Sequence, residues 1–184
     1  MSETSHGEML PQLARAAIRA RLGMATSALG NPPDWLQQPG ATFVTLMHKG
    51  SLRGCIGSLE AHRSLFDDVR ANAVAAAFRD PRFPPLTAKE LSETQVEVSL
   101  LSEAQPLTFS GEADVLAQLR SGIDGVVLEY GPHRGTFLPQ VWEQLPQPRD
   151  FLAHLKVKAG LSADFWADDI RLSRYTVEKW KGTA

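Results

Sequence analysis

The only cysteine of this chain, Cys55, lies in the segment LRGCIG at residues 52–57 and is its clearest chemical candidate. A thiol acts as a nucleophile when a nearby cation or base lowers its pKa. Arg53 stands two residues before Cys55, and in a regular strand both side chains point to the same face. His62 could reach the thiol if the residues after the segment form a tight loop. The alternative is structural, because free cysteine is often a small buried hydrophobe. We favour the structural alternative and expect Cys55 to be largely buried.

Arg53, Asp80 and Arg82 are the candidate binding residues. A guanidinium fork suits phosphate or carboxylate, so Arg53 could hold a small anionic ligand, or it could form a structural ion pair with Asp80 or a glutamate. Asp80 and Arg82 stand in the connector DPRFPP at residues 80–85, which its three prolines stiffen. Such a loop can hold polar groups in a fixed geometry, but Arg82 could equally tie the connector to a helix C-terminus. We expect Arg53 to meet an acid or an anion near Asp80, because a buried unpaired charge is strongly destabilising.

The sequence points to no metal and no cofactor. His48 and His62 flank the LRGCIG segment, but their spacing to Cys55 fits no standard ligand pattern. The chain contains no P-loop, GxGxxG or GxSxG motif, which argues against nucleotide-binding and α/β-hydrolase functions. Spacing alone identifies no complete set of nucleophile, base and orienting group. Two classes of function therefore stay open: an enzyme with Cys55 as its nucleophile, and a non-catalytic binding module.

Composition narrows the class of protein further. The chain has 184 residues, of which 43% are hydrophobic and 22% charged, as in an ordinary single globular domain. Its net charge of −2 argues against a domain-wide basic field and so against nucleic-acid binding. No apolar run approaches the roughly 20 residues of a membrane span. The polar first seven residues lack the apolar core of a signal peptide, so we expect a cytoplasmic protein whose cysteine stays reduced.

Hydrophobic periodicity and capping residues predict the elements that must position these side chains. In the first half of the chain we expect a helix over 8–22, a hairpin over 41–57 with its turn at 48–51, a helix from the Ser64 cap to the residues before Pro81, and a short helix capped by Thr87 and Glu90. In the second half we expect a strand over 95–101, a helix over 113–120, strands over 125–130 and 135–138, a helix from Pro148 to Gly160, and a last strand over 170–177. Hairpins separated by helices indicate an α+β fold with mostly antiparallel or mixed sheets.

The motifs of this chain, taken in order, resemble those of one known family. They are FVTL at 43–46, LRGCIG at 52–57, DPRFPPL at 80–86, EVSLL at 97–101, GIDGV at 122–126, LPQV at 138–141, FL at 151–152, KAGL at 158–161 and RY at 174–175. Together they make the chain similar to the AMMECR-type domain family, the protein A component of the AmmeMemoRadiSam system. The resemblance extends from about residue 8 to residue 179.

The resemblance implies an α+β fold of two unequal lobes, the larger with both termini and the smaller from the middle of the chain. On this basis we expect a flexible tail at residues 1–6, a single domain over 7–182, and Cys55 at the junction of the lobes beside a cleft. It implies no particular reaction. Family members occur beside a Memo-type protein and a radical-SAM protein, which suggests a shared pathway. We therefore interpret the chain as a binding component with these two proteins, or a small anionic ligand, as candidate partners, and keep the Cys55 enzyme as the alternative.

Overall fold

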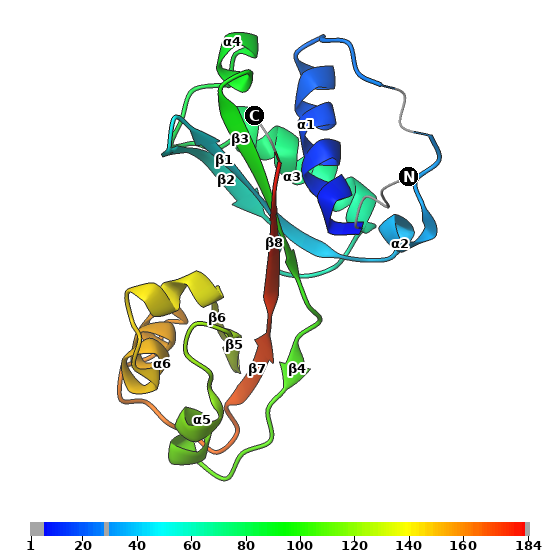
Figure 1. The fold of residues 1–184 in the computed structure, drawn as a ribbon. Helices are drawn as coiled ribbons and strands as arrows, with labels where there is room; N and C mark the ends of the chain where they lie inside the picture. The colour runs from blue at the N-terminus through cyan, green and yellow to red at the C-terminus, as the bar shows by residue number, and fades with distance from the viewer. Residues whose placement is uncertain (1–5, 28–29, 183–184) are drawn as a thin grey trace. The chain divides into compact units, whose positions relative to one another are not determined.

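The computed structural model describes residues 6–27 and 30–182, and these form two compact units (Figure 1). Unit 1 combines the N-terminal part of the chain, up to residue 101, with the C-terminal residues from 178 onward. Unit 2 is the intervening segment, 102–177. Helices and antiparallel sheets occur in both, so the predicted α+β class is confirmed. The larger unit contains both ends of the chain, and the smaller comes from its middle, as the resemblance implied.

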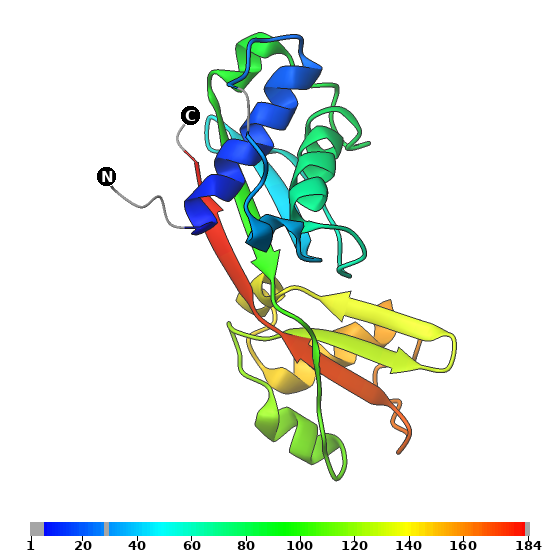
Figure 2. The ribbon, with the colours of Figure 1, turned by 90° about the vertical axis from the view of Figure 1, so that its right-hand side faces the viewer.

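Unit 1 is a sheet covered on one face by two helices. Its strands are β1 (Ala41–His48), β2 (Ser51–Gly57), β3 (Thr94–Leu101) and β8 (Val177–Lys181), in the order β2-β1-β3-β8. Its helices are η1 (His6–Glu8), α1 (Met9–Arg21), α2 (Asp34–Gln37), α3 (Leu65–Phe78) and α4 (Ala88–Leu91). Helices α1 and α3 pack against each other and against the sheet, and Figure 2 shows them side by side.

Local sequence explains these elements. The apolar face of α1 places Leu10, Leu13 and Ile18 in the core of unit 1, where they meet the inner face of β1 and β3. Helix α3 begins as the capping pattern predicts, because the Ser64 hydroxyl accepts the backbone N–H of Asp67 (3.1 Å). The predicted hairpin is confirmed, with β1 antiparallel to β2 across the turn at residues 49–50. β2 has β1 on one side only, so it is an edge strand.

Unit 2 has its own sheet and its own core. Its strands are β4 (Gln105–Pro106), β5 (Gly125–Tyr130), β6 (His133–Phe137) and β7 (Arg171–Tyr175), in the order β4-β7-β5-β6. Its helices are α5 (Glu112–Gln118), η2 (Pro139–Glu143) and α6 (Pro148–Lys158). Trp142 stacks on Phe151 at 3.8 Å between ring centroids in the core. Lys156 is 99% buried and is neutralised by Glu112, whose Oε1 lies 2.7 Å from the ammonium nitrogen.

Three sequence expectations differ from the structure. The single last strand predicted over 170–177 is divided into β7 and β8 at Thr176. There the Thr176 N–H donates to the Ser102 hydroxyl and the Thr176 carbonyl accepts from the Ser102 N–H, so Thr176 is outside both strands. The very short α2 and β4 were not predicted, since two to four residues carry no periodicity. His6, placed in the expected tail, begins η1 and lies 4.9 Å from the Trp35 ring; residues 1–5 of that tail lie outside the described residues. Within the described part of the chain, no helix has both the length and the apolarity to cross a bilayer.

Candidate functional site

The LRGCIG segment forms the edge strand β2, and the strand is irregular at Arg53. Gly54 pairs with Leu46 and Leu52 pairs with Met47, so Arg53 is an extra residue opposite the junction of two β1 residues. Such a bulge breaks the alternation of side chains along the strand. The premise of a regular strand, on which Arg53 and Cys55 would share a face, is therefore wrong. Arg53 instead reaches toward α4, whereas Cys55 stays on the face of the sheet that carries Thr45.

Cys55 is partly buried, neither fully enclosed nor exposed, and the expectation of a largely buried thiol stays a prediction. It lies opposite Thr45 in the ladder, and its backbone N–H points away from β1. Residues paired in this way have closely spaced side chains, which explains why the Cys55 Sγ lies 3.4 Å from the Thr45 Oγ1. The two side chains proposed to activate the thiol are engaged elsewhere. Arg53 is bonded to Glu90, and the exposed His62 has its Nδ1 2.9 Å from the carbonyl oxygen of Glu60.

Asp80 and Arg82 complete the free edge of β2 at Cys55. The Cys55 N–H donates to the Asp80 Oδ2 (3.0 Å), and the Cys55 carbonyl accepts from the Arg82 Nη2 (3.4 Å). The two side chains thus occupy the place of a neighbouring strand, which blunts an edge open to further pairing. This corrects the idea that Arg82 ties the connector to a helix C-terminus. Cys55, Asp80 and Arg82 are called the β2 edge site below.

The Asp80 carboxylate holds the Arg82 guanidinium in a fixed orientation. Arg82 donates from Nε to Oδ1 (3.0 Å) and from Nη2 to Oδ2 (2.7 Å), the two-pronged geometry of strong carboxylate pairs. These bonds, opposed by burial and helped by the backbone N–H groups of Cys55 and Arg82, hold the pKa of Asp80 well below its usual range. Asp80 is 98% buried, but 54% of the Arg82 side chain is exposed. The site therefore presents a positioned cation to solvent beside a half-buried thiol.

Arg53 meets an acid as expected, and of the two alternatives, Asp80 or a glutamate, the partner is Glu90. Its Nε donates to Glu90 Oε1 (3.1 Å), and its Nη2 donates to the carbonyl oxygen of Pro84 (2.8 Å). The bond from Arg53, together with the backbone N–H of Thr87, lowers the pKa of Glu90 to about 2 against the opposing effect of burial. Only 9% of the Arg53 side chain is exposed, and its Nη1 has no partner among the described residues. Arg53 therefore joins β2 to α4 and the proline connector from inside.

Gly54 and Gly57 mark close approach, as glycine within a strand suggests. A Cβ on Gly54 would lie 2.2 Å from the carbonyl oxygen of Ala76 in α3, and a Cβ on Gly57 would lie 2.2 Å from the Phe43 ring. Both distances are well inside van der Waals contact. The glycines therefore allow β2 to lie directly against α3 on one face and against an aromatic ring on the other.

A buried polar cluster that was not predicted from the sequence lies beneath the start of α3. Asp68, fully buried, accepts from the backbone and hydroxyl of Thr42 (2.8 and 2.7 Å), from Ser58 (2.7 Å) and from Arg63 Nε (2.8 Å). The Asn72 amide adds a bond of 3.1 Å to Asp68 and another to the Thr42 carbonyl. The available signal was the pair of Asp68 and Asn72, four residues apart on the apolar face of a helix. The cluster fixes α3 to β1 and to the loop that follows β2.

The histidines beside the LRGCIG segment are engaged in surface contacts. His48 Nε2 lies 3.2 Å from Glu93 Oε2, and His62 faces the Glu60 carbonyl. Among the described residues, no three histidine, cysteine, aspartate or glutamate side chains gather as a metal site would require. The chemistry that the geometry offers at β2 is recognition of an anion by Arg82 and reaction of a thiol whose polar neighbour is a hydroxyl.

Comparison with known proteins identifies the family. The chain matches the AMMECR1 family over residues 11–180. It belongs to the AMMECR1 family. A protein of Methanothermobacter thermautotrophicus is 39% identical over 94% of this chain and 92% of its own length, and Protein MJ0810 of Methanocaldococcus jannaschii is 33% identical over 94% and 88%. The crystal structure of the uncharacterized protein PH0010 from Pyrococcus horikoshii is 32% identical and superposes with a TM-score of 0.80 over 95% of this chain and 90% of that one. The resemblance drawn from the motifs is therefore confirmed.

Proposed function

We propose that this AMMECR1 protein is a non-catalytic binding component that holds a small anionic ligand at the β2 edge site. The observation that carries the proposal is the Arg82 guanidinium, which is half exposed and yet fixed by two bonds to the buried Asp80. A positioned guanidinium loses little side-chain freedom when it binds an anion. Asp80 is the positioning residue, Arg82 the binding residue, and Cys55 supplies the strand edge against which they are held.

The ligand chemistry follows from the donors that Arg82 has left. Its Nε and Nη2 are used by Asp80 and by the Cys55 carbonyl, whereas no described residue accepts from its Nη1. A carboxylate or phosphate oxygen is the matching acceptor. Because the contact is exposed to water, a single guanidinium supports affinity of about millimolar order. A ligand of this class would gain further affinity only from groups that a partner protein adds.

The alternative function is an enzyme that uses Cys55 as its nucleophile, with Arg53 and nearby polar residues assisting. The partial exposure of Cys55 is compatible with this alternative. A nucleophilic cysteine needs a base or a cation beside it. The sulfur lies against the Thr45 hydroxyl, and the nearby Arg82 guanidinium is paired with the Asp80 carboxylate, which offsets its charge. Arg53 is committed to Glu90 inside the unit. The binding role therefore accounts for more of the geometry.

The family resemblance also supports a role beside a Memo-type protein and a radical-SAM protein in one pathway. Mixing this chain with the two proteins from the same genome and measuring the mass of the mixture by light scattering tests it. We expect a complex at micromolar concentration. Three separate species at every concentration would contradict a direct partnership.

An NMR titration tests the proposed site. We expect phosphate and acetate, added at constant ionic strength, to shift the Cys55 and Arg82 amide signals and the Arg82 Nε–H signal in a saturable way. Arg82→Gln should abolish the effect, whereas Arg171→Gln should not, because Arg171 is also an exposed arginine paired with a carboxylate, Glu129 in unit 2. Arg82→Lys, which keeps the charge but not the fork, should retain weaker binding. Shifts that persist in Arg82→Gln, or that never saturate, would refute the proposal.

Thiol reactivity separates the enzyme from the binding role. The rate of alkylation of Cys55 by iodoacetamide, measured against pH, should rise around the ordinary thiol pKa of about 8.5 if the residue is not a nucleophile. Rapid alkylation near neutral pH, slowed by replacement of Arg82 or Thr45, would support the enzyme instead.

A further inference from the structure

A groove rich in arginine lies between α1 and α3, on the helical side of unit 1. Its volume is about 570 Å³. Small side chains of both helices line it, and arginines surround them: Ala17, Ala20, Arg21, Arg63, Asp67, Arg70, Ala71, Val74 and Arg79. Alanine at three of these positions lets a bound backbone approach the two helices closely. We call these residues the arginine groove; none of them belongs to the β2 edge site.

Most of the positive charge in the arginine groove is not neutralised. Arg63 is paired with the buried Asp68. Arg70 lies over the Phe66 ring, 4.9 Å from its centroid, and forms no ion pair among the described residues. The side chains of Arg21 and Arg79 have no partner in the described part of the chain, and both residues are exposed. The single acid of the groove, Asp67, is bonded to the Ser64 hydroxyl at 3.0 Å. The groove is therefore locally cationic in a chain of net charge −2.

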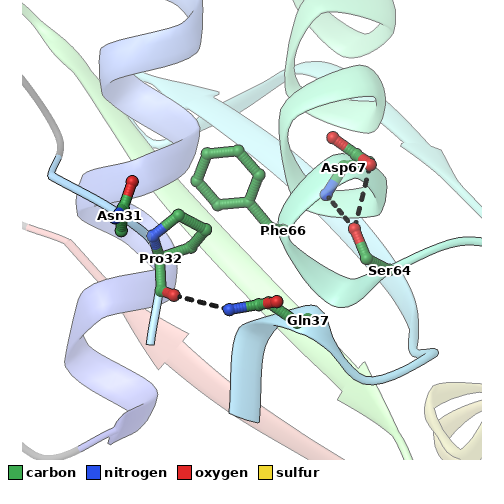
Figure 3. A pocket seen from close by; sticks show the side chains of 6 residues that line it. All are labelled: Asn31, Pro32, Gln37, Ser64, Phe66 and Asp67. Atoms are coloured by element: carbon green, nitrogen blue, oxygen red, sulfur yellow. Dashed lines mark hydrogen bonds between the residues drawn. The ribbon is translucent and has the colours of Figure 1, made fainter. Parts of the chain in front are cut away.

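A second groove of about 570 Å³ continues from the first, because the two share Asp67. Figure 3 shows its wall: the Phe66 ring above Pro32, with Ser64 and Asp67 at the start of α3. Asn31 and Gln37 add polar groups, and the Gln37 amide is fixed by donating to the Pro32 carbonyl (3.0 Å). A ligand that extends past Asp67 would thus leave the arginines and meet an aromatic and a proline ring. The lining therefore changes from cationic side chains in the arginine groove to apolar rings in the second groove.

The alternative explanation is structural: these arginines would stabilise the helices to which they belong. Arg21 is in the last turn of α1 and Arg79 caps α3, where cations interact favourably with the helix dipole. That explains a cation at each helix end. It does not explain why Arg70, one residue from Ala71 in the middle of α3, joins them around a small-residue floor. Arg21, Arg70 and Arg79 have no acid paired with them among the described residues, so their like charges repel one another, and an acidic partner removes that repulsion.

We propose that the arginine groove docks an acidic segment of a partner protein. The carboxylates of the segment face Arg21, Arg70 and Arg79, its backbone lies over the alanines, and an apolar side chain reaches Phe66. A polynucleotide fits less well, because it needs an extended basic surface and several aromatic rings for its bases, whereas Phe66 is the one aromatic side chain among the described residues that line the two grooves. The proposal goes beyond ligand binding at Arg82 and can be tested independently of it.

A peptide-binding experiment on the full chain tests the proposal. The probe is a fluorescein-labelled peptide of Glu, Ala and Leu, of about 18 residues, which spans about 27 Å as a helix. We expect fluorescence anisotropy to report binding at a Kd of about 100 μM or tighter at low salt, weakening as salt screens the contact. The double variant Arg21→Gln/Arg79→Gln should bind about tenfold more weakly. The control Arg134→Gln/Arg171→Gln removes two exposed arginines that pair with Glu129 in unit 2, and should bind like the parent.

Charge reversal distinguishes docking from a structural role. Arg21→Glu/Arg79→Glu should lose the Glu peptide and gain a peptide in which Lys replaces Glu. It should still unfold cooperatively, at a somewhat lower temperature than the parent, because both side chains are exposed but an acid then lies at each helix C-terminus. A fold role alone gives no such exchange of partners. Absence of binding at about 1 mM peptide, or equal loss in the control pair, overturns the proposal. Tighter binding of a single-stranded RNA of equal charge, lost in the same variant, overturns it in favour of a nucleic acid. Arg82→Gln should leave peptide binding unchanged, so the outcome is independent of the anion site.

Discussion

Replacing Glu90 by Gln tests how the LRGCIG hairpin is held to the rest of unit 1. Glu90 accepts from Arg53 Nε (3.1 Å) and Nη2 (3.3 Å), and its Oε2 also accepts the Thr87 N–H (2.9 Å) to close the capping box of α4. Glutamine fills the same place in a capping box, so the helix start survives the change. What is lost is the negative charge beside a guanidinium that is 9% exposed.

The structure gives the size of the effect. A pKa of about 2 for Glu90, against its ordinary 4.5, corresponds to about 3 kcal/mol of stability at neutral pH. Because 28% of the Glu90 side chain is exposed, water screens part of the interaction, and we expect a loss of about 2 kcal/mol. Arg53 adds to the loss rather than relieving it, since its Nη1 already lacks a partner among the described residues.

The same pair predicts how stability changes with pH. The pKa of Glu90 is lower in the folded than in the unfolded protein, so its contribution is complete above the unfolded value of 4.5. The contribution disappears as the pH falls toward about 2. Glu90→Gln should remove this part of the acid destabilisation. The part due to Asp80, whose pKa is also lowered by its bond to Arg82, should remain.

Urea unfolding at pH 7 and at points down to pH 3 measures both effects, with Glu93→Gln as the matched control. Glu93 lies three residues further on, is 50% exposed and pairs with His48 and Lys49 at the surface. We expect its replacement to change stability by less than about 0.5 kcal/mol. Equal losses for the two variants, or a Glu90→Gln variant with the parent's pH dependence, would refute the account of Arg53 as a buried, charge-dependent link.

Three further predictions concern the same unit and are measured by urea unfolding. Gly54→Ala should lower the free energy of unfolding by about 1–3 kcal/mol, because the added Cβ would lie 2.2 Å from the Ala76 carbonyl oxygen. In the control Gly30→Ala the added Cβ meets nothing within 4 Å, so the change should be neutral or slightly stabilising. Equal effects of the two changes would show that α3 moves to accommodate the new methyl group. Cys55→Ser should lower the free energy of unfolding by less than about 1 kcal/mol, because the serine hydroxyl keeps Thr45 as a partner. A larger loss would mean that the sulfur is packed more tightly than the partial burial of Cys55 indicates. Asp68→Asn should lower the free energy of unfolding by about 3 kcal/mol, because an amide N–H₂ then faces the donors of Thr42 or Ser58. A small loss would contradict the role of Asp68 as the acceptor at the centre of the cluster.

The elements of the fold were predictable where the signal is local. The Ser64 cap, the Thr87–Glu90 capping box and the turn between β1 and β2 each depend on residues close in sequence, and the structure has all three. The last strand was mispredicted because its division into β7 and β8 depends on Ser102, which is 74 residues away from Thr176. Periodicity cannot register a partner at that distance.

The candidate site was predictable in its residues but not in its pairing. Arg53, Asp80 and Arg82 are all part of one set of contacts around β2, but the sequence left two partners open for Arg53, Asp80 or a glutamate, and the pair that forms is the one with Glu90. The reason is the bulge: one extra residue in β2 turns the Arg53 side chain toward Glu90 and leaves the outer edge of Cys55 to Asp80 and Arg82. A bulge depends on how two strands register with each other, and that register is set by packing against α3 through Gly54.

The bulge also determines which of the two arginines, Arg53 or Arg82, is accessible to a ligand. A guanidinium bonded to Glu90 and to the Pro84 carbonyl serves the fold, because releasing it for a ligand would break both bonds of a side chain that is only 9% exposed. A guanidinium held at the edge by the buried Asp80 keeps its orientation while still facing solvent. Arg53 and Arg82 are indistinguishable in charge and close in the fold, but only Arg82 combines fixed geometry with access. That difference is why we propose Arg82 for anion recognition and assign to Arg53 a role in the stability of the LRGCIG hairpin.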